Sequence, residues 1–205
     1  MLMAVSLRII KLGGRLLDWD QLKPALTRWL ADQPVAKNVL VTGGGRLADQ
    51  VRHYDQLHNL DPTTVHFAAA ITMSVTARLL AALLGDLDTV TELDELVAAN
   101  PSHACVVFDS YLFLTKEETR ADGQRLPHGW QVTSDSIAAR LAQVTRADEL
   151  VLLKSALPER GATWRDVVRC GLVDDYFPEA VMPVPHVRYV NLRDAEAAEW
   201  QPPAR

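Results

Sequence analysis

The sequence predicts an α/β protein, specifically a three-layer αβα sandwich with a mainly parallel central sheet. Short apolar runs alternate along the chain with stretches whose apolar residues recur at helical spacing. Two of these runs end in glycine-rich turns, Lys11-Leu12-Gly13-Gly14 and Thr42-Gly43-Gly44-Gly45, and a helical pattern follows each turn. A strand, a glycine turn and a helix repeated in series favour parallel strands joined by crossover helices.

The chain up to residue 84 contains five predicted elements. Apolar runs predict strands at Leu7–Leu12 and Asn38–Val41. Asp61-Pro62 is typical of a helix start, because aspartate caps the first turn and proline fits there without losing a hydrogen bond. The predicted helices are 18–33 with Leu22, Leu26, Trp29 and Leu30 at helical spacing, a segment with Leu47, Val51, Tyr54 and Leu57 on one side, and Pro62–Leu84.

The chain after residue 84 continues the alternation of helices and strands. Leu112–Gly129 is polar and contains proline, which indicates a loop or a lid. Residues 1–192 therefore form a single predicted domain, and residues 193–205 a surface tail. The other predicted elements are a short helix at Thr91–Ala99, a strand at His103–Phe108, a helix capped by Ser134 with Ile137, Ala138, Leu141 and Val144 inward, a strand at Glu149–Leu153, a short helix from Thr163 to Gly171, and an edge strand at His186–Asn191.

Composition and charge disfavour several classes of partner. A net charge of −5 over 205 residues, without a Lys/Arg run, argues against nucleic acid. The richest apolar stretch, Val65–Leu84, is interrupted by polar residues, and the apolar start of the chain is too short for a signal peptide, so we expect no membrane insertion. Cys105 and Cys170 are interpreted as reduced residues, and the protein is expected to be cytoplasmic.

The two glycine turns are candidate phosphate-binding loops. Gly13, Gly14, Gly43, Gly44 and Gly45 present backbone N–H groups with no side chain in the way, which suits a phosphate at the start of a helix. Each glycine costs on the order of 0.5–1 kcal/mol relative to alanine in regular structure. Three in succession therefore indicate a sharp bend or contact with a ligand, with a flexible loop as the alternative. The spacing matches neither the Walker P-loop nor the dinucleotide fingerprint, which disfavours a dinucleotide-dependent oxidoreductase.

Lys11, Asp135 and Lys154 are the candidate catalytic residues. Lys11 and Lys154 each lie at the end of an apolar strand, so we expect both at the carboxyl edge of the sheet, where ligands gather in open α/β folds. Asp135 follows Ser134 in the first turn of a predicted helix, where it would accept hydrogen bonds from the glycine loops and orient the lysines. The alternatives are solvated lysines at strand ends and an aspartate favoured by the helix dipole. No metal ligand is assigned.

Four residues are candidate ligands for an anionic acceptor: Arg46, Arg52, His66 and His128. Taken singly, each is more often a surface or capping residue than a ligand. Trp130 lies near His128 in the sequence and would suit stacking on a flat substrate, although core packing is the simpler explanation.

Taken in order, four motifs resemble the amino acid kinase superfamily, which includes aspartate, acetylglutamate, uridylate and isopentenyl phosphate kinases. The motifs are Ile9–Gly14, Val41–Gly45, Val132–Ser136 and the strand that leads to Lys154, and the resemblance covers residues 7–180. It implies that Lys11 engages the transferred phosphoryl group and that Asp135 organises the lysines. It also implies that the glycines and Ser134 hold the phosphates of the two substrates, and that Mg²⁺ accompanies ATP.

Two further segments, 128–136 and 171–178, resemble a small branch of that superfamily. This branch phosphorylates (aminomethyl)furanmethyl phosphate in methanofuran biosynthesis. The resemblance implies an ATP-dependent phosphotransferase whose small acceptor already carries a phosphate group. The near-continuous apolar surface of the helix Pro62–Leu84, together with the habit of the superfamily, predicts a homodimer formed through this helix. Two alternatives stay open: a kinase that phosphorylates a carboxylate, and a binding protein of the same fold without catalysis.

Two features depart from the superfamily pattern. Arg15 stands where serine usually follows the glycine pair, so it either adds a phosphate ligand or obstructs one. After the strand Leu150–Leu153, many members continue with an aspartate-glycine segment that helps to hold the nucleotide, and Lys154–Gly161 lacks it. Lys154 is therefore not equated with the second catalytic lysine of the superfamily. These departures motivate the non-catalytic alternative.

Overall fold

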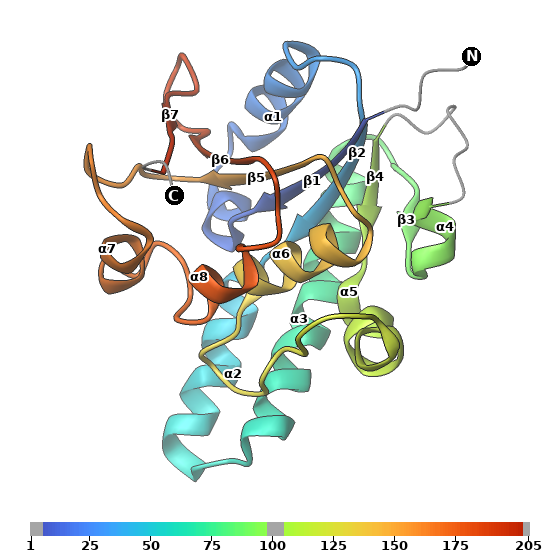
Figure 1. Ribbon diagram of the computed structural model, residues 1–205, viewed down its shortest axis with the longest axis vertical. Coiled ribbons are helices and arrows are strands. Elements are labelled where there is room, and N and C mark those ends of the chain that lie inside the picture. The colour runs from blue at the N-terminus through green and yellow to red at the C-terminus, as the bar shows by residue number, and fades with distance from the viewer. Residues whose placement is uncertain (1–5, 98–104, 203–205) are drawn as a thin grey trace.

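Seven strands form one central sheet. The computed structural model describes residues 6–97 and 105–202. Across the sheet the strands lie in the order β3-β4-β2-β1-β5-β6-β7 (Figure 1). All neighbouring strands are parallel except β6 and β7, which are antiparallel. The predicted α/β class with a mainly parallel sheet is confirmed.

Strands and helices alternate along the described chain. The strands are β1 (Leu7–Leu12), β2 (Lys37–Thr42), β3 (Thr89–Val90), β4 (Cys105–Phe108), β5 (Glu149–Lys154), β6 (Val187–Asn191) and β7 (Glu199–Trp200). The α-helices are α1 (Leu22–Ala31), α2 (Gly45–His58), α3 (Pro62–Leu83), α4 (Leu93–Val97), α5 (Ser110–Leu112), α6 (Ser134–Val144), α7 (Trp164–Arg169) and α8 (Phe177–Ala180). Between them lie the 3₁₀ stretches η1 (Gly14–Asp18) and η3 (Glu118–Arg120) and a π-helical stretch, η2 (Phe113–Glu117). Of these elements, β3, α5, α8 and β7 are ones that the sequence did not predict.

Side chains alternate across the sheet and create two apolar layers. On β1, Ile9 packs in a core that includes α6 and α8, whereas Ile10 and Leu12 pack in a core that includes α1 and the second half of α3. The helices therefore cover both faces of the sheet, which confirms the three layers (Figure 1). Because alternate residues of a strand share a face, Lys11 lies on the side of Ile9, beneath α6.

Helices α2 and α3 form a hairpin that extends beyond the sheet at the bottom of Figure 1. The predicted cap is present, since the Asp61 carboxylate accepts a hydrogen bond from the Thr64 N–H at 2.9 Å. By length and composition α3 would be able to cross a membrane, but half of its apolar window is buried inside the protein. Ala77 and Leu80 pack it onto the sheet, which is the environment of a core helix.

Several predicted boundaries differ from the observed ones. The helix expected from residue 18 begins at Leu22, because the residues after the first glycine turn form η1. The stretch expected as a loop or lid begins with α5, η2 and η3 and is irregular only from residue 121 to 133. The predicted surface tail is corrected in part: β7 pairs with β6 there, and the Trp200 side chain is buried. Residues 98–99 of one predicted helix, 103–104 of a predicted strand, 203–205 of the tail and Met1 to Val5 lie outside the described residues.

Candidate active site

Lys11, Asp135 and Lys154 meet at the carboxyl edge of the sheet. Strands β1 and β5 are parallel neighbours, so their carboxyl ends lie side by side beneath the first turn of α6. The Lys11 Nζ lies 2.9 Å from Asp135 Oδ1, and the Lys154 Nζ lies 2.8 Å from the same oxygen and 2.9 Å from Oδ2. Asp135 is only 4% exposed. A single buried carboxylate thus holds two ammonium groups from two different strands.

The electrostatics of this cluster keep the carboxylate charged. Burial alone would raise the pKa of Asp135, but the positive charges of Lys11 and Lys154 outweigh burial and hold that pKa below its ordinary value of 3.8. Burial lowers the pKa of Lys154 to about 8, and the Asp135 carboxylate opposes part of that decrease. At neutral pH the cluster therefore contains an anionic aspartate, and Lys154 is mostly protonated. The two lysines offer more positive charge than Asp135 neutralises, which suits a polyanion.

The glycine turns approach each other more closely than any side chain would allow. A Cβ atom on Gly14 would lie 2.4 Å from the Gly45 nitrogen, and one on Gly43 would lie 2.9 Å from the Ser134 Oγ. The N–H groups of Gly13 and Gly43 donate to the carbonyl groups of Leu153 and Leu12 at 2.8 and 2.9 Å. These two amides therefore fix the turns to the sheet, which leaves Gly14, Gly44 and Gly45 as the better candidates for contact with a ligand.

Two cavities flank Gly14. One has a volume of about 440 Å³ and lies beside Lys11, Lys154 and the segment Cys170–Leu172. The other has a volume of about 180 Å³ and lies between the second glycine turn, the α2–α3 hairpin and residues 130–137. Ser134 lines the smaller cavity, whereas Lys154 lines the larger one.

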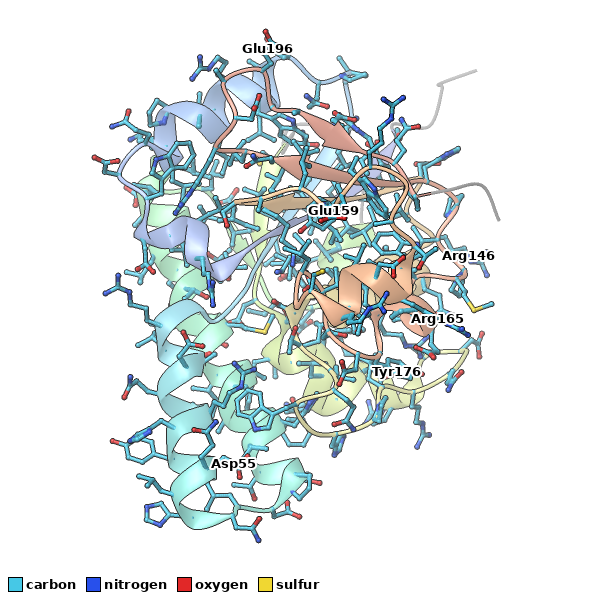
Figure 2. The ribbon with its side chains drawn as sticks, turned by 90° about the vertical axis from the view of Figure 1, so that its left-hand side faces the viewer. Asp55, Arg146, Glu159, Arg165, Tyr176 and Glu196 are labelled. Carbon is cyan, nitrogen blue, oxygen red and sulfur yellow. The ribbon has the colours of Figure 1, made fainter. Side chains whose placement is uncertain are left out.

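Two of the four predicted acceptor ligands line the smaller cavity, Arg52 and His66. The Arg52 guanidinium lies 4.4 Å from the centroid of the Trp130 ring, and the Trp130 Nε1–H donates to the Asp55 carboxylate at 2.7 Å. Asp55, labelled in Figure 2, lies on the α2–α3 hairpin. Trp130 is thus held against Arg52 as part of the cavity wall and is not a core residue.

The other two predicted ligands lie outside the smaller cavity. His128 stacks on His66, with ring centroids 4.9 Å apart. Burial, together with the charge of His128, lowers the pKa of His66, so His66 is neutral at pH 7. Arg46 forms an ion pair with Asp18 at 3.0 Å, and its side chain is 80% exposed. His128 therefore supports the wall through His66, while the structure brings Arg46 to neither cavity.

Sequence reasoning assigned no role to Asp174, which caps α6 from a distant segment. Its carboxylate accepts hydrogen bonds from the Thr133 and Ser136 N–H groups at 2.8 and 3.1 Å, and from the hydroxyl groups of both residues. Thr133, rather than Ser134 as predicted, occupies the cap position of α6, and its side chain makes no cap hydrogen bond. Burial raises the pKa of Asp174 to about 6, and the negative charge of Asp135 adds to this increase.

The segment that carries Asp174 also contacts the lysines. The Lys154 Nζ donates to the Leu172 carbonyl at 2.6 Å, two residues before Asp174. One short segment therefore positions both Lys154 and the helix end that bears Asp135. The available signal in the sequence was the resemblance of residues 171–178 to the small kinase branch, which carried no residue roles.

The fold and the site together define the class of protein: an α/β protein in which strand ends, glycine turns and a buried Lys11–Asp135–Lys154 cluster meet at one edge of the sheet. The profile of the amino acid kinase family matches residues 6–156. The chain therefore belongs to the amino acid kinase family, and a kinase is the class of enzyme to which it is related. No protein of curated function is matched by its sequence.

Solved structures agree with this family at the level of the fold. The chain is similar to UMP kinase from Ureaplasma parvum, with a TM-score of 0.63 and 13% identity over 95% of this chain and 93% of that one. It is also similar to uridylate kinase from Archaeoglobus fulgidus, with a TM-score of 0.58 and 14% identity over 89% and 88% of the two chains. Aspartate kinase from Synechocystis gives a TM-score of 0.61 and 13% identity over 97% of this chain but 40% of that one.

Proposed function

We propose that the protein transfers the γ-phosphoryl group of Mg²⁺-bound ATP to a small acceptor that already carries a phosphate group. The observation that carries this proposal is the Lys11–Asp135–Lys154 cluster beside the glycine turns, with one cavity on each side of Gly14. Direct phosphoryl transfer requires two bound anions to meet beside positive charge, and two cavities that share Gly14 next to the lysines provide such an arrangement.

The larger cavity fits the donor. ATP supplies the transferable phosphoryl group, and Lys11 and Lys154 would hold its phosphates as point charges. Tyr189, the segment Cys170–Leu172 and the residues Ser155 and Ala156, which stand where the aspartate-glycine segment is expected, also line this cavity. Among residues 6–97 and 105–202, no cluster of three acidic, histidine or cysteine side chains is placed to hold a metal ion. Mg²⁺ would therefore be held mainly by the phosphates, as is common for this ion.

The protein contributes position and charge rather than covalent chemistry. The reaction breaks the bond between the γ-phosphorus and the bridging oxygen, which leaves with its electron pair on ADP, and forms a bond from that phosphorus to an acceptor oxygen. Asp135 keeps both ammonium groups at the site, and the Gly14 turn excludes side chains from the line of transfer. An acceptor phosphate is already ionised, so no general base is needed, and neutral His66 serves as a cavity wall.

The smaller cavity fits a compact acceptor. Arg52 provides a cation, Trp130 a flat surface, and Met73 an apolar floor within about 180 Å³. We favour a phosphate over a carboxylate as the accepting group because Arg52 and the Gly44 and Gly45 amides together suit a dianion. From the resemblance of residues 128–136 and 171–178, the candidate acceptor is (aminomethyl)furanmethyl phosphate.

A coupled assay of ADP release tests this proposal. Purified protein with ATP and Mg²⁺ is incubated with (aminomethyl)furanmethyl phosphate, UMP or aspartate in turn. We expect ADP release with the first acceptor, and loss of that activity in Lys11→Ala and Asp135→Asn. Lys23→Ala removes an exposed lysine from α1 and serves as the matched control. ADP release with aspartate alone would favour the carboxylate-phosphorylating alternative, and equal turnover in both active-site variants would rule the assignment out.

The non-catalytic alternative is separated by calorimetry. It is motivated by Arg15 and by the missing aspartate-glycine segment after Lys154. A protein that binds neither ATP nor ADP at millimolar concentration, while it remains folded, would support that alternative.

A second copy of the chain is the proposed partner of α3. Its outer face carries Ile71, Val75, Leu79 and Leu83, which recur every four residues and are 50%, 44%, 58% and 38% exposed. Residues four apart lie on one face of a helix, so these side chains form a continuous apolar stripe. A homodimer through this stripe would remove it from water. Sedimentation that shows only a monomer at micromolar concentration would contradict this proposal.

A further inference from the structure

Arg15 lies at the junction of the two cavities. Among the described residues, Gly14 and Arg15 are the pair that lines both of them. Gly14 has no side chain, so Arg15 contributes the one side chain at this junction. A phosphoryl group that passes from a donor in the larger cavity to an acceptor in the smaller one has to pass this point.

The backbone around Arg15 is fixed, while its side chain is free. The Leu16 N–H donates to the Gly13 carbonyl at 2.8 Å, and the Arg15 carbonyl accepts a hydrogen bond from Arg193 at 3.4 Å. Within residues 6–97 and 105–202, the Arg15 guanidinium forms no hydrogen bond and no ion pair, and the residue is exposed. The neighbouring arginines differ from it, because Arg46 is paired with Asp18 and Arg52 with Asp49.

We propose that Arg15 is a catalytic residue that binds the transferred phosphoryl group, a role that rests on the proposed kinase function. During transfer, charge spreads over the three equatorial oxygens of that group. Lys11 and Lys154 would contact these oxygens as single point charges, and both ammonium groups are already paired with Asp135. A guanidinium offers two parallel N–H donors to such oxygens, and Arg15 has them uncommitted at the junction.

This placement decides between the two roles that Arg15 could have at a position where serine is usual. An obstructing arginine would have to fill one of the cavities or be held across it by partners. Arg15 is exposed and without a guanidinium partner among the described residues, and both cavities remain open on either side of it. Its side chain can therefore turn toward a bound anion without breaking an existing contact.

Nucleotide binding by calorimetry, without an acceptor, tests the contact directly. The probes are the non-hydrolysable ATP analogue AMP-PNP and ADP, each with Mg²⁺, because they differ in the terminal phosphoryl group that Arg15 would bind. We expect Arg15→Ser to weaken AMP-PNP binding by about tenfold or more and to leave ADP binding unchanged within error. Arg15→Lys should lose less, because it keeps the charge but not the bidentate geometry. Thermal unfolding checks that each variant is folded.

Arg165→Ser is the matched control, because it removes an exposed arginine from α7 (labelled in Figure 2) that lines neither cavity. In the coupled assay, Arg15→Ser should also lower kcat by on the order of a hundredfold. The proposal is overturned if Arg15→Ser weakens neither probe, weakens both equally, or strengthens AMP-PNP binding, which would mean obstruction. If the wild-type protein binds neither probe, the kinase function itself falls, and the role of Arg15 falls with it.

Discussion

Replacing Asp174 by asparagine should change how the stability of the protein depends on pH. Asp174 is 8% exposed, caps α6 and lies near the negative charge of Asp135. Burial and that charge raise its pKa from 3.8 to about 6 in the folded protein. In the unfolded chain the carboxyl group titrates near its ordinary value. Between pH 3.8 and about pH 6, the Asp174 carboxyl group is therefore mostly protonated in the folded protein and mostly ionised in the unfolded chain.

The sign and the size of the effect follow from this difference. Because the folded state binds more protons, this group's contribution to the free energy of unfolding is largest below pH 3.8 and is lost as the pH rises through 6. One pKa unit corresponds to about 1.4 kcal/mol, so the full loss is about 3 kcal/mol. Asparagine does not titrate. Relative to wild type, Asp174→Asn should therefore become more stable by up to that amount as the pH rises.

Urea unfolding between pH 4 and pH 7.5 measures this difference. Wild type, Asp174→Asn and the control Asp175→Asn, which changes the adjacent exposed aspartate, are compared at each pH. Asp135, the charged neighbour of Asp174, has a pKa below 3.8 and stays ionised in both proteins over this range, so it does not contribute to the difference. A difference between wild type and Asp174→Asn that stays constant over this range would refute the reasoning, as would an equal pH dependence for Asp175→Asn.

Three further predictions concern other parts of the molecule. Burial lowers the pKa of Lys154 to about 8, so kcat/KM should fall above about pH 8 as Lys154 loses its proton. In an active Lys154→Arg variant this decrease should be absent from the pH–rate profile. A profile that is the same in wild type and variant would count against the role of Lys154. The buried guanidinium of Arg140 lies 3.1 Å from the Glu118 carboxylate. Glu118→Ala removes that carboxylate and should lower the free energy of unfolding by about 3–5 kcal/mol in chemical denaturation. A loss below about 1 kcal/mol would show that the pair behaves like a surface ion pair. Leu79→Asp should give a folded monomer in sedimentation, and a dimer that persists would place the interface elsewhere.

Much of the fold was predictable because it depends on local patterns. The apolar run that ends at Lys11 and the glycine turn after it predict a strand and its end from neighbouring residues alone. Asp61 was recognised as a cap from two consecutive residues, and its hydrogen bond to Thr64 is present. The short elements between Thr91 and Gly129 were predicted less well, since a few residues carry too little periodicity to separate a 3₁₀ or π-helical stretch from a loop.

The candidate site was predictable in its residue types but not in its contacts. Lys154 could not be equated with the second catalytic lysine of the superfamily from the sequence, because the aspartate-glycine segment expected after that lysine is missing here. The structure places its Nζ at 2.8 Å from Asp135, because β5 is the parallel neighbour of β1. Arg46 and Arg52 were equivalent candidates in the sequence, and the structure separates them, since α2 directs one to the cavity and the other to Asp18.

The sequence by itself determined the alternation of strands and helices, the two glycine turns, and which charged residues follow strand ends, because each of these depends on residues close together in the chain. Only the tertiary structure decided that Asp174 caps a helix that begins 40 residues earlier, that Trp130 lines a cavity, and that Arg15 stands between two cavities. These facts depend on how strands order themselves in the sheet and how helices pack on it. Such packing is settled by the burial of many distant side chains together, and no short stretch of sequence records it.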